Sequence, residues 1–404
     1  MRTHIYLKPM LADYELPERY KAEFAILAGE NLHKPHSETR ASGRGLSQLS
    51  QRQRAQMLLN MAVELRQGGF AILSPYSLAE KHVRWLVRRW VLDRQLAVGS
   101  VELRLSHLRA LCSWIGKANM VGRIDDYLDR PPGYTRRYVA QVDRSWDGHQ
   151  IDAAAKIDEI AQTDPHVAIQ MKLEAAFGLR AKESWRLRPA RDLLPSGYLH
   201  VQDGTKGGRP RQVLIEFGWQ YELLIEAAAL AARTNPDRGS LIPATYTQER
   251  WRRRFYTVLE KHGVTKRGDG VTAHGLRHQY LQQMYERLTG KPAAIKGVRG
   301  GLDQDAHREA MRKVVEAAGH SRRTKANAYL STPFAMATSQ RPVVTREMAL
   351  AAIRQENGVK LRAARALGIS RTALYRLLAP AGGSAVGAGG GFTAASAPAE
   401  KLTR

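Results

Sequence analysis

Residues 317–330 read AAGHSRRTKANAYL and place a histidine after a glycine, with a tyrosine nine residues later. Three earlier stretches carry charged residues that complement this pair: FGLRAKE at 177–183, TKGGRPR at 205–211 and AHGLRH at 273–278. In chain order, the four stretches contribute six residues with polar or charged side chains: Arg180, Lys206, His274, Arg277, His320 and Tyr329. This set suits a site that binds a phosphodiester and holds a nucleophile beside it.

A DNA phosphodiester is anionic and its leaving alkoxide is poor, so cleavage without a metal needs fixed positive charge, a nucleophile and a proton donor. Arginine is a planar fork of donors that stays charged, and we expect Arg180 and Arg277 to bind the non-bridging oxygens and stabilise the transition state. Tyr329 is the predicted nucleophile of a covalent phosphotyrosyl intermediate. Because a phenol has an unperturbed pKa of ~10, such a nucleophile needs a cationic pocket to lose its proton at neutral pH. This chemistry requires no metal and no other cofactor.

The remaining polar residues have predicted roles around that step. Lys206, near the tip of a predicted hairpin, is expected to protonate the leaving 5′ oxygen. His274 and His320 are expected to hydrogen-bond the phosphate, with His274 the better candidate to accept the tyrosine proton. Glu183 is interpreted as a carboxylate that orients an arginine, because an acid beside the phosphate would repel it.

Each of these residues has a plainer interpretation when it is taken alone. An isolated arginine in a basic protein is usually a surface residue, and a tyrosine in the context Ala-Tyr-Leu is usually part of a core. His278, beside Arg277, is interpreted as structural. The occurrence of all four stretches in one order is the strong signal.

The four stretches resemble the tyrosine recombinase (phage-type integrase) family in their order and local spacing. The resemblance covers roughly residues 75–335 and is firmest over 175–330. It implies that Arg180, Lys206, His274, Arg277, His320 and Tyr329 take the family's six active-site positions. It also implies a site-specific DNA recombinase that cuts and rejoins DNA through a 3′-phosphotyrosyl intermediate and a four-way junction. The expected partner is double-stranded DNA that carries specific sites. The protein is expected to form a homodimer on each site and a homotetramer in the synapse. Whether accessory DNA-bending proteins take part is left open.

Two features depart from the family's usual pattern. The interval from Arg277 to His320 is longer than usual because of an insertion around 289–308. A helix-turn-helix-like unit also follows the tyrosine at 343–379. The insertion is expected to leave the site in place, and its contacts with DNA or a neighbouring subunit are left open.

The composition agrees with a nucleic-acid partner. The 404 residues include 63 Lys and Arg against 38 Asp and Glu, a formal charge of +25, and the pI is about 10.3. Such an excess favours nucleic acid first and an anionic membrane second. The sequence lacks a run of 18 apolar residues, and the one cysteine excludes an internal disulfide. We therefore expect no membrane association and a cytoplasmic, nucleoid-associated bacterial protein.

The predicted fold class is mainly α with a small antiparallel β-sheet (α+β). Breaks in the pattern predict successive segments, which are an N-terminal arm at 1–45, a helical core-binding domain at 46–130, a linker at 131–150, a catalytic domain at 151–335, a linker at 336–342, a helix-turn-helix-like unit at 343–379 and a disordered tail at 380–404. The arm is expected to be loosely structured, with a short helix around 17–29. In the catalytic domain, two β-rich runs at 198–202 and 212–216 predict a hairpin. Helical pattern is expected to resume at Arg308 after the insertion.

The core-binding domain is predicted to be a helical bundle with basic outer faces. Helical patterns run over 51–66, from a capping box at 77–80, and over 101–115. For any single arginine there, an ordinary solvated surface is the better interpretation, but for the set we favour phosphate contacts because few acids pair with them. The predicted DNA-binding residues of this domain and of the hairpin are Arg84, Arg88, Arg104, Arg109, Arg209 and Arg211.

The segment 360–374 resembles the inversion-stimulation-factor class of DNA-binding helices. A short helix, a turn with Gly368 and a second helix opened by Ser370 form a helix-turn-helix outline. This outline predicts that Arg371, Thr372, Tyr375 and Arg376 face DNA. The alternative is a helical hairpin that packs on protein.

Two other functions remain open. The same residues would serve a type IB topoisomerase or a telomere-resolvase-like enzyme, although the two-domain layout favours a recombinase. A non-catalytic DNA-binding regulator on a recombinase scaffold would suit the C-terminal unit, but the intact set of six residues argues against it.

Overall fold

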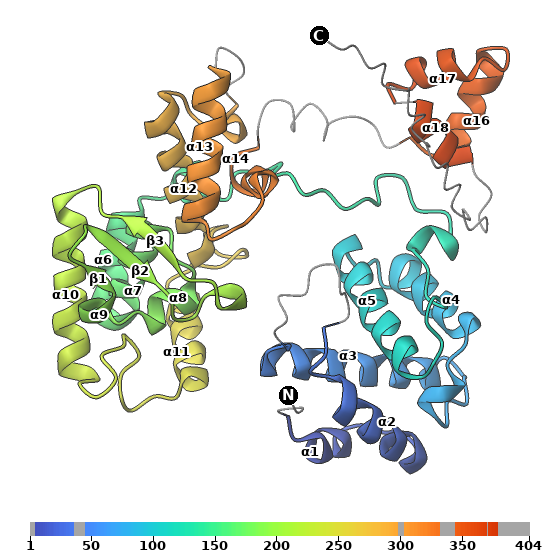
Figure 1. The fold of residues 1–404 in the computed structure, drawn as a ribbon, viewed down its shortest axis with the longest axis horizontal. Coiled ribbons are helices and arrows are strands. Elements are labelled where there is room, and N and C mark those ends of the chain that lie inside the picture. Colours follow the sequence, from blue (N-terminus) through green and yellow to red (C-terminus); the bar gives the residue numbers. More distant parts are fainter. Residues whose placement is uncertain (1–4, 36–44, 298–302, 332–343, 370, 379–404) are drawn as a thin grey trace, which may run out of the picture. The chain divides into compact units, whose positions relative to one another are not determined.

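The computed structural model describes residues 5–35, 45–297, 303–331, 344–369 and 371–378 (Figure 1). Within them the chain is mainly helical and contains one three-stranded antiparallel sheet, which confirms the predicted α+β class. The chain divides into two compact units, of which one comprises residues 1–136 with 342–404 and the other residues 137–341.

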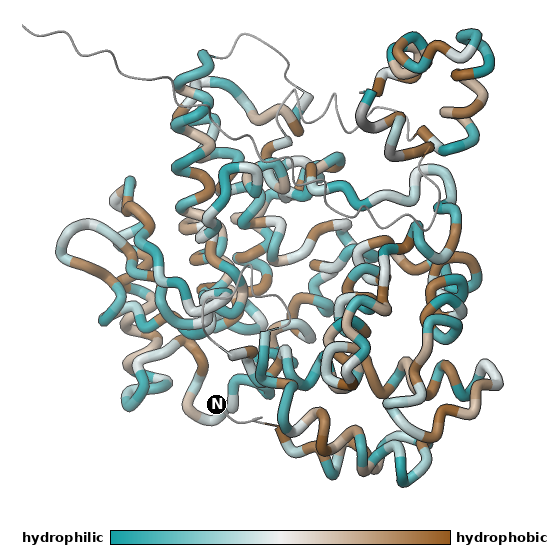
Figure 2. The backbone as a smooth tube through the Cα atoms, turned by 45° about the vertical axis from the view of Figure 1, so that its right-hand side comes forward, coloured by the Kyte–Doolittle hydropathy of each residue, from teal (hydrophilic) through white to brown (hydrophobic). Residues whose placement is uncertain are grey.

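The N-terminal part of the first unit is a helical bundle. Its described helices are α1 (Leu7–Ala12), α2 (Glu18–Asn31), α3 (Gln48–Gln67), the short turn η2 (Pro75–Ser77), α4 (Glu80–Arg88), the π-helical turn η3 (Arg89–Asp93), α5 (Val98–Trp114) and η4 (Ile124–Asp126). Leu58, Val83 and Leu105 lie in one hydrophobic cluster with less than 2% exposure each. Helices therefore bury one face and leave the other polar, and hydrophobic and hydrophilic residues alternate along them in Figure 2.

The N-terminal arm is more ordered than predicted: α2 agrees with the short helix expected around 17–29, whereas α1 was not predicted and both helices pack into a core. Helix α2 buries Tyr20, Phe24 and Leu27 in the same cluster as α3 and α5. Their spacing of four and three residues is helical, but charged residues between them made the periodicity weak. Residues 36–44 of the predicted arm lie outside the described residues.

The start of α4 also differs from the predicted capping box. The predicted cap, Ser77, ends the turn η2 and donates its hydroxyl to the carbonyl of Ser74 (2.6 Å). Helix α4 starts after Ala79, whose N–H donates to Nδ1 of His82 at 3.0 Å. Pro75 starts a 3-10 turn that includes the predicted cap, Ser77, so Ser77 does not cap α4. The ring of His82 takes the place of the expected glutamate.

The second unit surrounds its sheet with helices (Figure 1). Its described elements are η5 (Asp147–His149), α6 (Ala153–Thr163), α7 (Pro165–Phe177), α8 (Ala181–Arg186), α9 (Pro189–Asp192), β1 (Leu193–Leu194), β2 (Tyr198–Val201), η6 (Lys206–Gly208), β3 (Arg211–Leu214), α10 (Gly218–Thr234), α11 (Gln248–Lys261), α12 (Ala273–Thr289), η7 (Ala294–Lys296), α13 (Gln304–Ala317), η8 (Arg323–Ala326) and α14 (Asn327–Leu330). The predicted hairpin is β2–β3, in the register Tyr198 opposite Leu214. Strand β1 has only two residues, too few for a sequence pattern, and it extends the sheet beside β2.

The local sequence explains where α7 begins and where it ends, directly before Arg180 and the site. The carboxylate of Asp164 accepts hydrogen bonds from the backbone N–H groups of His166 and Val167, both at 3.1 Å, and Pro165 follows at the first helical position. The helix ends at Gly178, which has φ 59°, and a Cβ there would lie 2.5 Å from the Tyr280 ring. Only glycine fits this turn.

Helix α13 begins earlier than predicted. The carboxylate of Asp303 accepts hydrogen bonds from the N–H groups of Asp305 and Ala306, so the helix starts at Gln304 instead of Arg308. Of the predicted insertion, residues 298–302 lie outside the described part of the chain.

The described part of 344–378 has a small core of its own. It contains α16 (Arg346–Gln355), α17 (Lys360–Ala366) and α18 (Arg371–Leu378) around Ala349, Ala363 and Leu374. Gly368, with φ 63°, lies between α17 and α18, as the helix-turn-helix outline predicts. Ser370, the linker at 336–342 and the tail at 380–404 lie outside the described residues.

Candidate active site and nucleic-acid interface

Glu183 is the centre of a buried ion-pair network in the second unit. Arg180 precedes α8, and its backbone N–H and Nη1 donate to the two oxygens of Glu183 at 2.8 and 2.6 Å. Arg211, at the start of β3, donates from Nη1 and Nη2 to the same two oxygens at 2.9 and 2.7 Å. The Glu183 side chain is fully buried, and this bidentate pairing fixes the β2–β3 hairpin against α8.

The Glu183 carboxylate stays ionised in this environment. Burial alone would raise its pKa, but hydrogen bonds from Arg211 and the charges of Arg211 and Arg180 lower the pKa to about 2. Glu183 therefore holds Arg180 and Arg211 by ion pairs, and Arg211 is bound inside the protein instead of reaching the surface where it was predicted to contact DNA.

Arg277 joins three segments beneath the site. It lies on α12, is fully buried, and donates to the carbonyls of Gly178 and Ala318. Arg180 also donates to the Ala318 carbonyl, at 2.9 Å. The two arginines thus share one acceptor directly before the Gly-His pair, which ties the end of α13 to α8 and α12.

Tyr329 lies against this arginine pair on the short helix α14. Its side chain is 6% exposed, and its hydroxyl oxygen lies 3.5 Å from Nε of Arg277 and 3.2 Å from Nε2 of His320. The guanidinium carbon of Arg277 lies 5.8 Å from the centre of the tyrosine ring. The predicted nucleophile, one predicted phosphate-binding arginine and one predicted histidine therefore meet in space.

Three histidines with lowered pKa values surround Tyr329. Burial, followed by the positive charges of Arg180 and Arg277, lowers the pKa of His320 to about 4. The same causes lower the pKa of His274 to about 4, although its side chain keeps an exposed edge. Buried His278 has a pKa of about 3, owing to burial and then to His274. All three imidazoles are neutral at pH 7.

The contacts single out a different histidine from the one that we expected to accept the tyrosine proton. The ring centre of His274 lies 6.4 Å from that of Tyr329, whereas His320 reaches the hydroxyl. His278, interpreted as structural, has its ring centre 4.8 Å from the tyrosine ring. Sequence spacing does not distinguish which of these rings faces the hydroxyl.

Lys206 is near but not in the cluster. It lies in η6 between β2 and β3, is exposed, and its charge contributes to the low pKa of His320. Among the described residues, no hydrogen bond joins it to the other five predicted site residues. Arg209, in the same connection, is also exposed.

Two polar residues that sequence reasoning missed hold the backbone of the tyrosine. Nε2 of Gln282 donates to the Tyr329 carbonyl at 3.2 Å and to Oδ1 of Asp143 at 2.9 Å. Close by, the N–H of Ala140 donates to the carbonyl of Asn327 at 2.9 Å. Segment 140–143 is more than 130 positions from its partners in the sequence, so no local pattern indicated these contacts.

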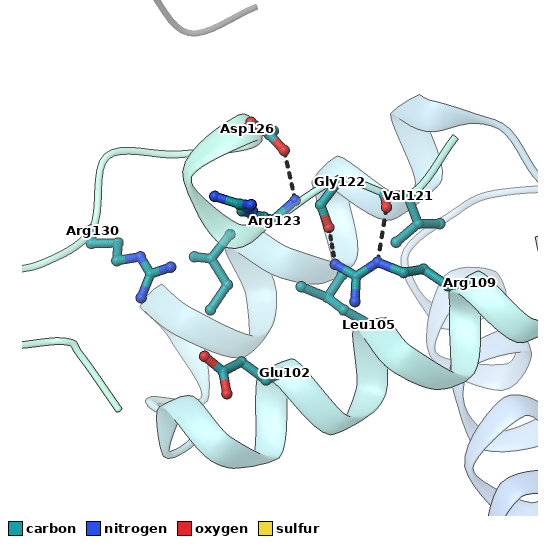
Figure 3. A pocket seen from close by; sticks show the side chains of 9 residues that line it. Glu102, Leu105, Arg109, Val121, Gly122, Arg123, Asp126 and Arg130 are labelled. Atoms are coloured by element: carbon teal, nitrogen blue, oxygen red, sulfur yellow. Dashed lines mark hydrogen bonds between the residues drawn. The ribbon is translucent and has the colours of Figure 1, made fainter. Parts of the chain in front are cut away.

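The predicted DNA-binding arginines of the first unit are in different environments. Arg84 is exposed and pairs with Glu80 at 2.6 Å, and Arg88 is exposed. Arg104 lies over the Trp90 ring, with its guanidinium carbon 5.4 Å from the ring centre. Arg109 donates to the carbonyls of Val121 and Gly122 beside a pocket of about 610 Å³ (Figure 3). The Arg109 side chain therefore hydrogen-bonds to the backbone of the protein itself. The pocket is lined by both acidic and basic residues and has no part in the cluster around Tyr329.

The predicted DNA-facing residues of the C-terminal unit are only partly described. Arg371 is exposed, and its guanidinium carbon lies 5.7 Å from the centre of the Tyr375 ring. The side chains of Thr372 and Arg376 lie outside the described part of the structure.

The described residues contain no group of three or more His, Cys, Asp or Glu side chains placed to hold a metal ion. Within the same ranges, every helix is too short or too polar to span a bilayer.

The family model described as Integrase matches residues 143–283. This part of the chain is similar to members of the integrase family. The match includes Arg180, Lys206, His274 and Arg277, while His320 and Tyr329 follow its end. A second model, described as Bacterial regulatory protein, Fis family, matches residues 341–379. The resemblance to phage-type integrases and the helix-turn-helix assignment are confirmed at this level.

Several solved structures are similar to this chain. A XerH site-specific recombinase bound to palindromic difH substrate is 17% identical, with 87% of this chain and 93% of that chain covered and a TM-score of 0.46. A lambda integrase(75–356) dimer bound to a COC′ core site is 16% identical, with 71% and 90% covered and a TM-score of 0.45. The Tn1549 transposon integrase in complex with circular intermediate DNA is 13% identical, with 79% and 98% covered and a TM-score of 0.44. No curated protein matches the sequence.

Proposed function

We propose that this chain is a site-specific DNA recombinase that cuts and rejoins DNA through a 3′-phosphotyrosyl intermediate at Tyr329. The observation that carries the proposal is the contact of the Tyr329 hydroxyl with both Nε of Arg277 and Nε2 of His320. A nucleophile, a cation and a neutral base within reach of one another are what attack on a phosphodiester needs. The integrase match over 143–283 supports the same reaction class.

The first step forms one bond and breaks another. The Tyr329 oxygen attacks phosphorus, its proton passes to Nε2 of His320, and the bond from phosphorus to the 5′ oxygen breaks. Arg180 and Arg277 stabilise the charge on the non-bridging oxygens. Lys206, exposed in the β2–β3 connection, supplies the proton for the leaving oxygen once DNA draws that connection toward the site.

Rejoining reverses these steps. A 5′ hydroxyl from the partner strand attacks the phosphotyrosine, and the tyrosine leaves. Because the covalent linkage conserves the energy of the broken bond, the exchange needs no ATP. His274, beside the site with a neutral ring, donates or accepts a hydrogen bond at the phosphate.

The ion-pair network gives the site its net charge. Arg180, Arg211 and Arg277 converge on one carboxylate, Glu183, so the network keeps an excess of two positive charges. Glu183 holds the guanidinium groups in position before the substrate binds, so no free energy is needed to orient them during the reaction. This excess favours an anionic substrate.

The partners follow from the family and the composition. With a formal charge of +25, the chain is expected to bind duplex DNA through phosphate contacts. We propose a homodimer on each site and a homotetramer when two sites pair, acting on the bacterial nucleoid. The Fis-like unit at 341–379 is proposed to contact DNA through Arg371, Thr372 and Arg376.

The same Fis-like unit favours a second candidate, a DNA-binding regulator without catalysis. A recombination assay separates the two functions. Two copies of the DNA that flanks the gene are placed on one plasmid and incubated with wild type or Tyr329→Phe. The recombinase proposal expects rearranged plasmid with wild type only. DNA binding by wild type without any rearrangement or strand cleavage would favour the regulator.

A further inference from the structure

Three arginines meet one carboxylate at the point where β2 leads into the connection that carries Lys206. This carboxylate belongs to Asp203, three residues before the lysine. Its Oδ2 lies 2.8 Å from Nη2 of Arg191 and 3.5 Å from Nε of Arg188, and its Oδ1 lies 3.8 Å from Nη2 of Arg186. Arg186 ends α8, Arg191 belongs to α9, and Arg188 lies between the two helices. Asp203 therefore ties the start of the connection to α8 and α9.

A second carboxylate holds the arginine that lies closest to Asp203. Nε of Arg191 donates to Oδ1 of Asp192 at 2.7 Å, and Asp192 is only 1% exposed. The same oxygen accepts from Nε2 of Gln202 at 3.0 Å, and Oδ2 of Asp192 accepts from the N–H of Arg188 at 3.0 Å. The Asp203 side chain is 24% exposed, so its ion pairs are less screened than those of fully exposed residues.

The backbone directly after Asp203 lies against α8. Gly204 has φ 79°, and a Cβ at this position would lie 2.4 Å from the carbonyl oxygen of Lys182, in α8. Only glycine allows this close approach. Side-chain ion pairs and backbone packing thus fix the same end of the connection, and both fix it to the helix that begins directly after Arg180.

The other end of the connection is fixed by a separate ion pair. Arg211 donates from Nη1 and Nη2 to Glu183 at 2.9 and 2.7 Å. Between the two fixed ends, residues 206–210 are all exposed, and Lys206 is the first of them. The connection can therefore rearrange over this exposed part when DNA binds, while Asp203 and Arg211 keep their positions.

We propose that Asp203 is a positioning residue for Lys206. Through the three arginines, it fixes the point from which the lysine extends toward the leaving 5′ oxygen. A proton donor must come within about 2.6–3.2 Å of its acceptor, so a small displacement of this point slows the transfer. The Lys206 ammonium gives its proton to the oxygen as the bond to phosphorus breaks, and Asp203 itself exchanges no proton. This inference rests on the proposed function, in which Lys206 protonates the leaving group.

The test changes the leaving atom. Two nicked duplexes from the DNA that flanks the gene differ only in the 5′ bridging atom of the cleaved phosphate, which is oxygen or sulfur. A thiol has a pKa of about 8.5, so sulfur leaves without a donated proton, whereas an alkoxide needs one. Lys206→Ala should cleave the oxygen substrate roughly 10²- to 10⁴-fold more slowly than wild type, and the sulfur substrate at close to the wild-type rate.

Asp203→Asn should show the same dependence on the leaving atom. We expect cleavage of the oxygen substrate to slow by roughly 10²-fold, the effect of a misplaced reacting group, and cleavage of the sulfur substrate to stay close to wild type. DNA affinity should be equal or higher, because three arginines lose an anionic partner. Asp237→Asn, which removes the same charge from an exposed position after α10, should match wild type on both substrates.

A second variant tests the same idea without removing a charge. In Gly204→Ala, the added Cβ meets the Lys182 carbonyl and displaces the start of the connection, so this variant should also recover on the sulfur substrate. Its matched control is Gly197→Ala, because Gly197 has φ 78° but no atom within 4 Å of an added Cβ. The control should carry the same backbone strain and cleave both substrates like wild type.

Three results would overturn the proposal. The first is Asp203→Asn that is equally slow on both substrates, and the second is Asp203→Asn that cleaves the oxygen substrate as fast as Asp237→Asn. The third is a double variant, Asp203→Asn with Lys206→Ala, that cleaves the oxygen substrate more slowly than Lys206→Ala alone, because Asp203 would then act independently of the lysine. Wild type that cleaves neither duplex would contradict the proposed function itself, and this inference with it.

Discussion

Nε2 of His320 lies 3.2 Å from the hydroxyl oxygen of Tyr329, nine residues further along the chain. The turn η8 between them folds the chain so that the two side chains meet beside Arg277. With a pKa of about 4, His320 is neutral at physiological pH and has a lone pair or a proton to share with the phenol. This pair is the most direct link between the fold and the proposed chemistry.

His320→Gln should slow strand cleavage by roughly 10²- to 10⁴-fold, the range of a general acid or base. DNA binding should be nearly unchanged. Because the pKa values of His320 and His274 are about 4, protonation of these rings should cost activity only as the pH falls toward 4, and not between pH 8 and 5.5. Single-turnover cleavage of a nicked substrate across this pH range measures both effects, with His200→Gln on β2 as control. A histidine-dependent loss centred near pH 6.5 would contradict the assignment.

Glu183→Gln should destabilise the integrase domain and abolish cleavage. The substitution removes the only carboxylate that Arg180 and Arg211 contact among the described residues, and breaking a buried ion pair costs roughly 3–5 kcal/mol. Because its pKa is about 2, this contribution is present at neutral pH and is lost only under strongly acid conditions, as pH falls through that value. Urea unfolding at pH 7 measures the loss. Glu249→Gln, whose side chain is 72% exposed, should change stability little.

Gln282→Ala should weaken cleavage more than DNA binding. Gln282 is 1% exposed and holds the carbonyl of Tyr329 to Asp143, so its removal lets α14 shift, and a displacement of this kind costs roughly 10²-fold in rate. The matched control is Gln279→Ala, one turn earlier on α12, because Gln279 accepts from the N–H of Asp147 but does not touch Tyr329. Equal cleavage rates for the two variants would show that the contact to Tyr329 does not position the nucleophile.

Glu174 should make the wild-type protein less stable as pH rises. Its carboxyl is fully buried on α7, accepts from Oγ of Ser184 at 3.0 Å, and has one oxygen without a partner among the described residues. Burial raises its pKa to about 8, with a further contribution from Glu183, against 4.5 in the unfolded chain. The folded state therefore keeps a proton that the unfolded state loses between pH 4.5 and 8.

Over this interval, Glu174 should lower the free energy of unfolding by at most about 1.4 kcal/mol per pH unit as pH rises. Glu174→Gln should remove this dependence, and denaturant unfolding at pH 5, 6.5 and 8 compares the two slopes. The buried histidines have the opposite sign, since their folded pKa values lie below 6.5, so only the difference between variant and wild type is diagnostic. Parallel slopes for variant and wild type would mean that Glu174 is ionised in the folded state.

Sequence order predicted the components of the site better than their contacts. The cap at Asp164 and the helix end at Gly178, which lead the chain to Arg180, follow local rules of sequence. The sequence did not indicate two contacts between residues far apart in the chain, that of Arg211 with Glu183 and that of Gln282 with Tyr329. These contacts depend on how elements far apart in the chain pack, which no local spacing encodes. The packing of the N-terminal helices into the core was not predicted for a different reason, because charged residues between the apolar ones weakened the helical pattern.

The most direct test of the central claim is covalent trapping on a nicked duplex that carries the DNA flanking the gene. Cleavage of the nicked strand close to the nick releases a short fragment that carries the 5′ hydroxyl, so the reverse reaction is prevented and a covalent complex accumulates. Wild type should give a complex stable to denaturant, with the DNA attached through its 3′ phosphate to the peptide that contains Tyr329. Tyr329→Phe should bind the same duplex with equal affinity and give no complex. A complex that still forms with Tyr329→Phe, or that maps to another residue, would contradict the account.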